Sequence, residues 1–301
     1  MAGGAVGHAT RNRGLRPSGS RSESGPANFF NPNFLLGTKG EMMKPKRLVC
    51  ISDLHSGHVV GLTPPQWDVA APKPHLEKSY AMRRIIWDFY AATLKSLQPI
   101  DILLVNGDCI DGRNEGRGST ELLYVDRNDQ VSMAIDCIRE AKAKSVVMAY
   151  GTGYHTGMEE DFERPIAEAV KAVKIGSVDS IDVNGVVVNY RHYLPGSQVP
   201  HGRHTATARE RQWNMLWSLR DEYPLAQIVI RSHVHYFGFA GDGQGLALTT
   251  PALEGDGSKF GARLLSGLVD IGLVYFDITD RERWTWDKRL LRLPKTEAIR
   301  V

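Results

Sequence analysis

Side chains able to bind metal ions occur in five clusters along this 301-residue chain, each just after an apolar stretch. The potential ligands are carboxylates and imidazoles rather than a series of cysteines. In chain order they are Asp53 and His55, Asp108 and Asp111, His155, His192, and His233 and His235. Oxygen and nitrogen ligands suit borderline to hard divalent ions such as Mn²⁺, Fe or Zn²⁺. Ligands at the ends of successive strands predict a cleft that holds metal ions.

Alternating strands and helices are predicted to position these clusters. Apolar runs predict strands at 47–52, 102–105, 145–150 and 227–231, and the pattern between them predicts helices near 76–97, 128–143, 160–173 and 205–222. Asn184-Gly185 predicts a hairpin between 180–183 and 186–190, whose second strand leads to His192. The segments 237–240, 246–250 and 268–276 are typical of antiparallel strands. This order predicts an α/β fold of two packed sheets flanked by helices.

Composition and charge exclude several classes of protein. With 42% hydrophobic residues, the chain is long enough for one domain with a large core, or at most two. Residues 1–44 carry a net charge of +4, which leaves −1 of the total +3 for the remainder. A nearly neutral body is unsuited to a long nucleic-acid groove. The three cysteines show no paired spacing, and Cys50 and Cys109 are expected to be small buried residues.

The chain is predicted to consist of three parts. Residues 1–44 are rich in Gly, Ser and Arg and are expected to be disordered. This segment is typical of an organelle transit peptide, or it reflects a start codon placed upstream of Met42 or Met43. A single domain is expected over 45–279, followed by a tail at 280–301. Because no apolar run approaches a signal peptide or a membrane span, we expect a cytoplasmic, intracellular protein that binds no membrane.

The five clusters, taken in order, resemble the calcineurin-like metallophosphoesterase superfamily over roughly 46–277. The motifs that carry the resemblance are D-x-H at Asp53, G-D-x-x-D at Asp108, a Gly-x-His at His155, His192, and H-x-H at His233. The segment 151–157 also resembles versions of the superfamily found in phages and prophages. The resemblance implies a metallophosphoesterase-type sandwich of two mixed β-sheets flanked by helices.

The resemblance also implies a role for each residue. Asp108 bridges two divalent ions, most simply Mn²⁺, with Fe or Zn²⁺ as alternatives. Asp53, His55 and His235 bind the first ion, and His192 and His233 bind the second. His155 acts as a general acid or stabilises charge on phosphoryl oxygens, and Asp111 accepts a hydrogen bond from it. A loop-capping role for Asp111 is the alternative.

One position departs from the family pattern. Where the family has an Asn ligand to the second metal, this chain has Tyr154, or Thr152 if the loop carries an insertion. Neither is a good substitute for an amide oxygen. Glu159, Glu160 and Asp161 follow closely and could supply an oxygen, although an acidic helix N-terminus also explains them.

The implied function is a dinuclear metal-dependent phosphoesterase that hydrolyses a phosphodiester or phosphomonoester by metal-activated hydroxide. A nuclease acting on single strands or ends, and a non-catalytic scaffold that retains the fold, are the alternatives. The expected partner is a phosphoester, with nucleic acid disfavoured as a long duplex. Four histidines outside the motifs are expected at the surface, and four arginines are expected to hold phosphate or to be solvated: His58, His75, His201 and His204, and Arg113, Arg117, Arg191 and Arg203.

Overall fold

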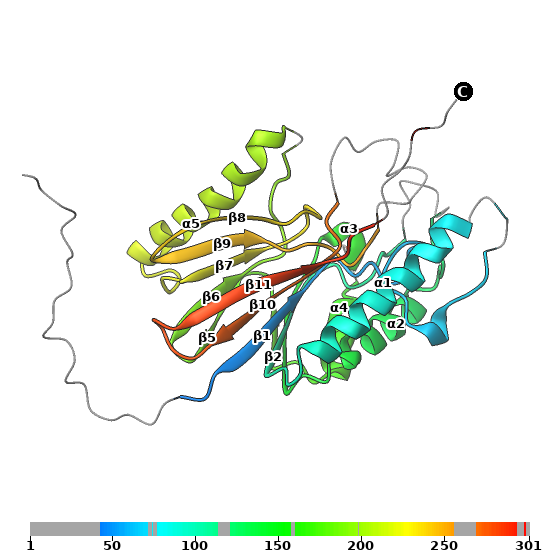
Figure 1. Ribbon diagram of the computed structural model, residues 1–301, viewed down its shortest axis with the longest axis horizontal. Coiled ribbons are helices and arrows are strands. Elements are labelled where there is room, and N and C mark those ends of the chain that lie inside the picture. Colours follow the sequence, from blue (N-terminus) through cyan, green and yellow to red (C-terminus); the bar gives the residue numbers. More distant parts are fainter. Residues whose placement is uncertain are drawn as a thin grey trace, which may run out of the picture. The chain divides into compact units, whose positions relative to one another are not determined.

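The computed structural model describes residues 43–71, 74, 77–113, 121–157, 160–197, 199–255, 269–293 and 298. The segment 1–42, expected to be disordered, lies outside the described residues. Residues from Met43 onward form one compact unit of four layers, in which two mixed sheets face each other between helices (Figure 1). The predicted α/β fold class is confirmed.

The first sheet has the order β11-β10-β1-β2-β3-β4. Its strands are β1 (Lys46–Ile51), β2 (Ile102–Asn106), β3 (Ser145–Ala149), β4 (Lys174–Gly176), β10 (Gly272–Ile278) and β11 (Trp284–Leu290). β1 to β4 are parallel to one another. β10 pairs antiparallel with β1, and β11 pairs antiparallel with β10. The four parallel strands therefore end at one edge of the sheet.

The second sheet has the order β5-β6-β7-β9-β8. Its strands are β5 (Asp179–Val183), β6 (Val186–Tyr190), β7 (Ile228–Arg231), β8 (Gly238–Asp242) and β9 (Gly245–Thr249). β6, β7 and β9 are parallel. Asn184 and Gly185 join β5 to β6 with φ angles of 52° and 85°, as a tight hairpin turn requires.

Helices cover the outer face of each sheet (Figure 1). α1 (Glu77–Ser96), α2 (Arg127–Glu140) and α4 (Glu163–Ala169) share a core with the first sheet, and α5 (Arg203–Leu219) contacts β8 and β9. A one-turn helix, α3 (Gly153–Thr156), follows β3, and short 3₁₀ helices span Pro65–Trp67 and Pro200–Gly202.

Alternation along the strands explains the layering. In β1, Val49 and Ile51 pack toward the helices, while Leu48 and Cys50 pack toward the second sheet. Successive side chains of a strand point to opposite faces, so a continuous apolar run is buried on both sides. Cys50 and Cys109 are buried free thiols, as expected for small apolar residues.

Three expectations about elements were wrong. Residues 280–301 are not only a tail, because β11 completes the edge of the first sheet. The expected helix at 160–173 is shorter, and β4 follows it. The last three expected strands do not form one antiparallel run: β10 joins the first sheet, while β9 pairs parallel with β7 and antiparallel with β8. Local periodicity identifies a strand but carries no information about its partner.

Within the described part of the chain, no helix is both long and apolar enough to cross a membrane.

Candidate metal centre

The predicted ligands gather where parallel strands of both sheets end. Asp53 and Asp108 follow β1 and β2, and His155 lies in α3 after β3. From the second sheet, His192 follows β6, and His233 and His235 follow β7. The structure therefore brings together all the residues assigned to metal binding and catalysis, including His55 and His235, which are 180 residues apart.

A first group of ligand atoms comes from Asp53, His55 and His235. His235 Nε2 lies 3.2 Å from Asp53 Oδ1 and 3.3 Å from His55 Nε2. On the other side of the His55 ring, Nδ1 lies 3.2 Å from Asp111 Oδ1. Since a carboxylate accepts, Nδ1 carries a hydrogen, and Nε2 is the nitrogen that faces the group.

A second group comes from Asp108, His192 and His233. His192 Nε2 is 2.9 Å from Asp108 Oδ2, and its Nδ1 donates to the main-chain oxygen of Asn106 at 2.7 Å. This bond fixes the tautomer of His192, because a carbonyl oxygen can only accept. Asp108 also groups with His55 and His155, so it lies between the two sets.

The donors in this cluster fit divalent cations. Asp53 Oδ1 and His192 Nε2 are buried without a well-aligned hydrogen bond within the described residues, although His235 Nε2 lies 3.2 Å from the first and Asp108 Oδ2 lies 2.9 Å from the second. Buried polar atoms normally have such a bond. The short distance between His55 Nε2 and His235 Nε2 brings two nitrogens together beside the Asp53 carboxylate. A cation in each group would satisfy the donor atoms of that group.

Electrostatics couple the carboxylates to the imidazoles. Burial opposes ionisation of Asp53 and Asp108, yet the neighbouring histidines hold both pKa values below the usual range. Burial likewise opposes charge on His55 and His192, but nearby carboxylates raise their pKa values to about 10 and about 9. By contrast, burial and a neighbouring imidazole lower the pKa values of His155 and His233. Metal ions at this centre would therefore compete with protons for the nitrogens of His55 and His192.

The backbone is strained at five of the ligands. Asp53, His55, Asp108, His233 and His235 have φ angles of 52°, 42°, 51°, 72° and 53°. Such left-handed angles are uncommon outside glycine and cluster at functional sites.

Two glycines allow the close approach of the strand ends. A Cβ at Gly151 would lie 2.1 Å from Asp108 Oδ1, and a Cβ at Gly107 would lie 2.8 Å from Cγ of His192. Asp108, His192 and the segment after β3 can thus meet only because both positions lack a side chain.

A chain of buried hydroxyl groups supports the centre, and sequence reasoning missed it. Ser52 donates to Asp53 Oδ2 at 2.6 Å and lies 2.7 Å from the hydroxyl of Thr250. Thr250 contacts Ser232 at 2.7 Å, and Asn106 donates to Ser232 at 2.6 Å. The network links Asp53 to Asn106, whose main-chain oxygen holds His192.

The expected role of Asp111 needs correction. His155 Nδ1 donates to the main-chain oxygen of Asp111 at 2.8 Å, whereas the Asp111 carboxylate lies 3.7 Å from it. That carboxylate lies closer to His55, at 3.2 Å. The main chain of Asp111 therefore fixes the tautomer of His155, and its side chain orients a histidine of the first group.

The loop that departs from the family pattern places Thr152 beside Asp108. The Thr152 amide donates to Asp108 Oδ1 at 2.6 Å, and its hydroxyl lies 3.1 Å from the same oxygen. Tyr154 is 54% exposed, with its ring edge-on to His155. Glu160 forms an ion pair with Arg127 at 2.5 Å. Asp161 accepts from the amides of Glu163 and Arg164, as a helix N-terminus predicts, and Glu159 lies outside the described residues.

Three acidic or basic residues near the centre were missed or misplaced. His58 was expected at the surface but is 1% exposed and lies 2.9 Å from Glu254 Oε1. Glu254 follows β9 at a strand end, a position that the same strand-end argument could have identified. Glu163 is buried in α4 and accepts from the amides of Cys109 at 3.0 Å and Gly151 at 2.7 Å.

The remaining candidates lie elsewhere. His201 and His204 are exposed as expected, while His75 and Arg117 lie outside the described residues. Arg191 forms an ion pair with Glu210 at 2.9 Å, and its side chain is 26% exposed. Arg203 stacks over the ring of Tyr236, and Arg113 is largely exposed.

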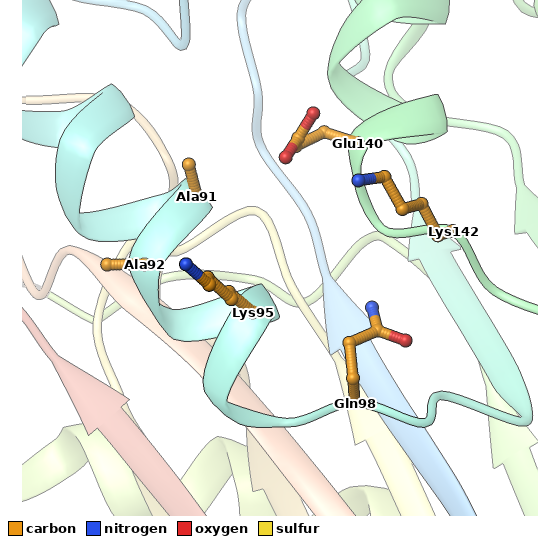
Figure 2. Close-up of a pocket in the computed structure, with 6 residues that line it drawn as sticks. All are labelled: Ala91, Ala92, Lys95, Gln98, Glu140 and Lys142. Atoms are coloured by element: carbon orange, nitrogen blue, oxygen red, sulfur yellow. The ribbon is translucent and has the colours of Figure 1, made fainter.

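A groove of about 400 Å³ lies between the C-terminal ends of α1 and α2 (Figure 2). Lys95, Gln98, Glu140 and Lys142 line it together with two alanines. These helix ends lead into the beginnings of β2 and β3, so the groove lies at the sheet edge opposite the metal centre.

Comparisons with known proteins give similarity at the level of structure. No protein-family model and no curated protein matches the chain. Among solved structures, the chain is similar to an archaeal phosphodiesterase (12% identity, 81% of this chain and 99% of that one, TM-score 0.42). It is also similar to vacuolar protein sorting 29 from Cryptosporidium parvum (11% identity, 82% of this chain and 98% of that one, TM-score 0.40). A third similar structure is the E. coli phosphoesterase Yfce (9% identity, 77% of this chain and 91% of that one, TM-score 0.38). Nothing about activity or substrate follows for this chain from similarity at this level.

Proposed function

We propose that the chain is a metal-dependent phosphoesterase with two divalent ions at the strand ends. One observation carries the proposal: two groups of oxygen and nitrogen ligand atoms meet at Asp108, a buried carboxylate. An anion with two oxygens is suited to lie between two cations. The resemblance of the five motifs to calcineurin-like metallophosphoesterases supports the same assignment.

In this proposal, Asp53, His55 and His235 hold the first ion, His192 and His233 hold the second, and Asp108 serves both. Mn²⁺ suits the mixed carboxylate and imidazole donors, with Fe or Zn²⁺ as alternatives. When bound, a pair of such ions supplies Lewis-acid charge for phosphoryl oxygens and lowers the pKa of water.

The protein groups around the ions orient ligands and handle a proton. Asp111 and the main-chain oxygen of Asn106 keep one nitrogen of His55 and one of His192 protonated, which turns the other nitrogen toward the centre. His155 has its Nδ1 held by Asp111, so Nε2 is the atom that exchanges a proton or contacts the phosphoryl group. Burial and the neighbouring His55 lower the pKa of His155, which makes its protonated form a stronger acid but a less populated one.

The proposed substrates are small phosphodiesters or phosphomonoesters, or a short nucleic-acid end. The nearly neutral charge of the body disfavours an extended duplex.

The test is a metal-supplemented assay of the purified full chain. After chelation, the protein is reloaded with Mn²⁺, Fe²⁺ or Zn²⁺, and bound metal is measured beside hydrolysis of an aryl phosphodiester, an aryl phosphomonoester and a single-stranded oligonucleotide. We expect two ions per chain and metal-dependent hydrolysis of at least one substrate. Binding of ions without turnover would favour a scaffold, and absence of both would refute the proposal.

Asp108→Asn is the first variant to compare. We expect it to remove nearly all activity and to lower the metal content of both positions, because a neutral amide cannot offset two dications. Wild-type metal stoichiometry in this variant would contradict the position of Asp108 between the ions.

A further inference from the structure

Glu254 is held rigidly against the first group of ligands. The amide of Leu253 donates to the main-chain oxygen of Asp53 at 3.1 Å, and the amide of Gly255 donates to that of Val60 at 2.9 Å. The backbone on both sides of Glu254 is thus tied to the segment that carries Asp53 and His55. Its side chain is 15% exposed.

The Glu254 carboxylate contacts three histidines. Oε1 lies 2.9 Å from Nδ1 of His58, which is itself buried. Oε2 lies 3.7 Å from His55 Nε2 and 3.5 Å from His235 Nδ1. His58 therefore holds one oxygen and leaves the other facing the nitrogen that His55 presents to the first ion.

These spacings match those between ligands of one ion. Donor atoms about 2.0–2.2 Å from a cation lie roughly 3–4.4 Å apart, depending on the angle between them. The pairs Asp53–His235 at 3.2 Å, His55–His235 at 3.3 Å and His55–Glu254 at 3.7 Å all fall within this range.

The geometry points to Glu254 as an additional oxygen ligand of the first ion, with His58 as the residue that positions it. This inference rests on the proposed function, since it concerns the same centre. The Glu254 carboxylate groups with His55 and Asp111, so Glu254 would share His55 with Asp53 and His235 and would add a further carboxylate to the donors around the first ion. Such a set favours Mn²⁺ or Fe²⁺ over Zn²⁺, which prefers four ligands.

The experiment measures Mn²⁺ and Zn²⁺ binding by equilibrium dialysis of the full chain, wild type beside Glu254→Gln. Loss of even an outer partner of a metal ligand weakens affinity roughly 10–100-fold. In Glu254→Gln, we expect the affinity for the tighter-bound Mn²⁺ ion to fall by at least this factor and the affinity for Zn²⁺ to fall less. In His58→Gln, we expect a loss of Mn²⁺ affinity between that of wild type and that of Glu254→Gln. Glu160→Gln is the matched control: it removes the same charge from a side chain paired with Arg127, and its affinity should equal that of wild type.

A second readout separates binding from folding. If Glu254 only supports the fold, Glu254→Gln will lower the melting temperature of the chelated protein while both Mn²⁺ affinities stay at wild-type values, and the inference is wrong. If the wild-type protein binds two ions and is active but Glu254→Gln keeps wild-type Mn²⁺ affinity, the inference is wrong and the proposed function still stands. A wild type that binds no Mn²⁺ or Zn²⁺ overturns the inference and the proposed function together.

Discussion

Strained backbone angles at single residues orient the ligand side chains. After β1, β2 and β7, a residue with positive φ turns the chain sharply; these residues are Asp53, Asp108 and His233. Angles of this kind cost of order 1–3 kcal/mol each unless the surroundings hold them. Here those surroundings include Ser52, which donates to Asp53, and Gly151, which leaves room for Asp108.

His155→Ala should separate proton transfer from metal binding. We expect metal content near wild type and a fall in kcat of roughly 10²–10⁴-fold for a poor leaving group. A good leaving group should be partly spared, because it needs less protonation. Equal losses for both substrates would instead assign His155 to phosphate binding, and loss of metal would make it a ligand.

Thr152 rather than Tyr154 is expected to affect the metal requirement. The hydroxyl and amide of Thr152 contact Asp108, whereas the Tyr154 ring is half exposed. Thr152→Val should raise the Mn²⁺ concentration needed for half-maximal rate, and Tyr154→Asn should leave it unchanged. A titration in which Tyr154→Asn lowers the requirement would show that Tyr154 occupies the place of the family's Asn ligand.

At the scale of elements, α4 links the ends of β2 and β3. Glu163, in the first turn of α4, accepts from the amides of Cys109 and Gly151, the residues that follow these strands. Burial and the nearby Asp108 raise the pKa of Glu163 to about 7, even though the two amides favour its charged form. One side chain thereby fixes the spacing between Asp108 and the α3 loop.

Glu163 also predicts a pH dependence of the metal-free protein. Between its ordinary value of 4.5 and about 7, the native state binds a proton that the unfolded state lacks. The contribution of this proton to stability is therefore complete below 4.5 and is lost as the pH rises through 7, with a size of up to roughly 3 kcal/mol.

Urea unfolding in the presence of a chelator measures this effect. Wild type should lose more stability between pH 5 and pH 8 than Glu163→Gln, which cannot titrate. The variant should also be less stable at pH 5, because the NH₂ group of Gln is a donor and would face one of the two backbone amides that Glu163 accepts from. Identical pH slopes in the two proteins would contradict the raised pKa.

At the scale of the whole molecule, the proposed ions would connect two sheets. Asp53 and Asp108 come from the first sheet, and His192 and His233 come from the second. The core between the sheets is apolar, with residues such as Leu48, Val188 and Phe276 buried completely. Ion binding at one edge would therefore add a cross-link to a packing that already holds the sheets together.

Metal removal should lower thermal stability by a measurable amount. Free Mn²⁺ at 100 times its dissociation constant adds about 2.7 kcal/mol if only the native state binds it. For a body of this size, that corresponds to roughly 5–10 °C in melting temperature. Asp108→Asn should show little of this shift, and an equal shift in the variant would indicate binding elsewhere.

The sequence alone determined where the ligand-bearing strands end and which chemical groups follow them. Apolar runs ending in Asp or His are local signals, because strand formation and the residue that follows it depend on neighbours along the chain. The Asn184-Gly185 turn and the fold class follow from equally local rules.

Only the tertiary structure decided which groups pair across the centre. The carboxylate of Asp111 lies against His55 rather than His155, and Glu254 and His58 lie beside the first ligand group although their spacing in the chain shows no motif. The position of β11 at the edge of the first sheet could not be predicted either, because the residue pattern of a strand does not indicate which strand it pairs with. The contacts of Asp111 with His55 and of His58 with Glu254 join segments about 50 to 200 residues apart, whose separation in space is set by tertiary packing and not by the order of residues.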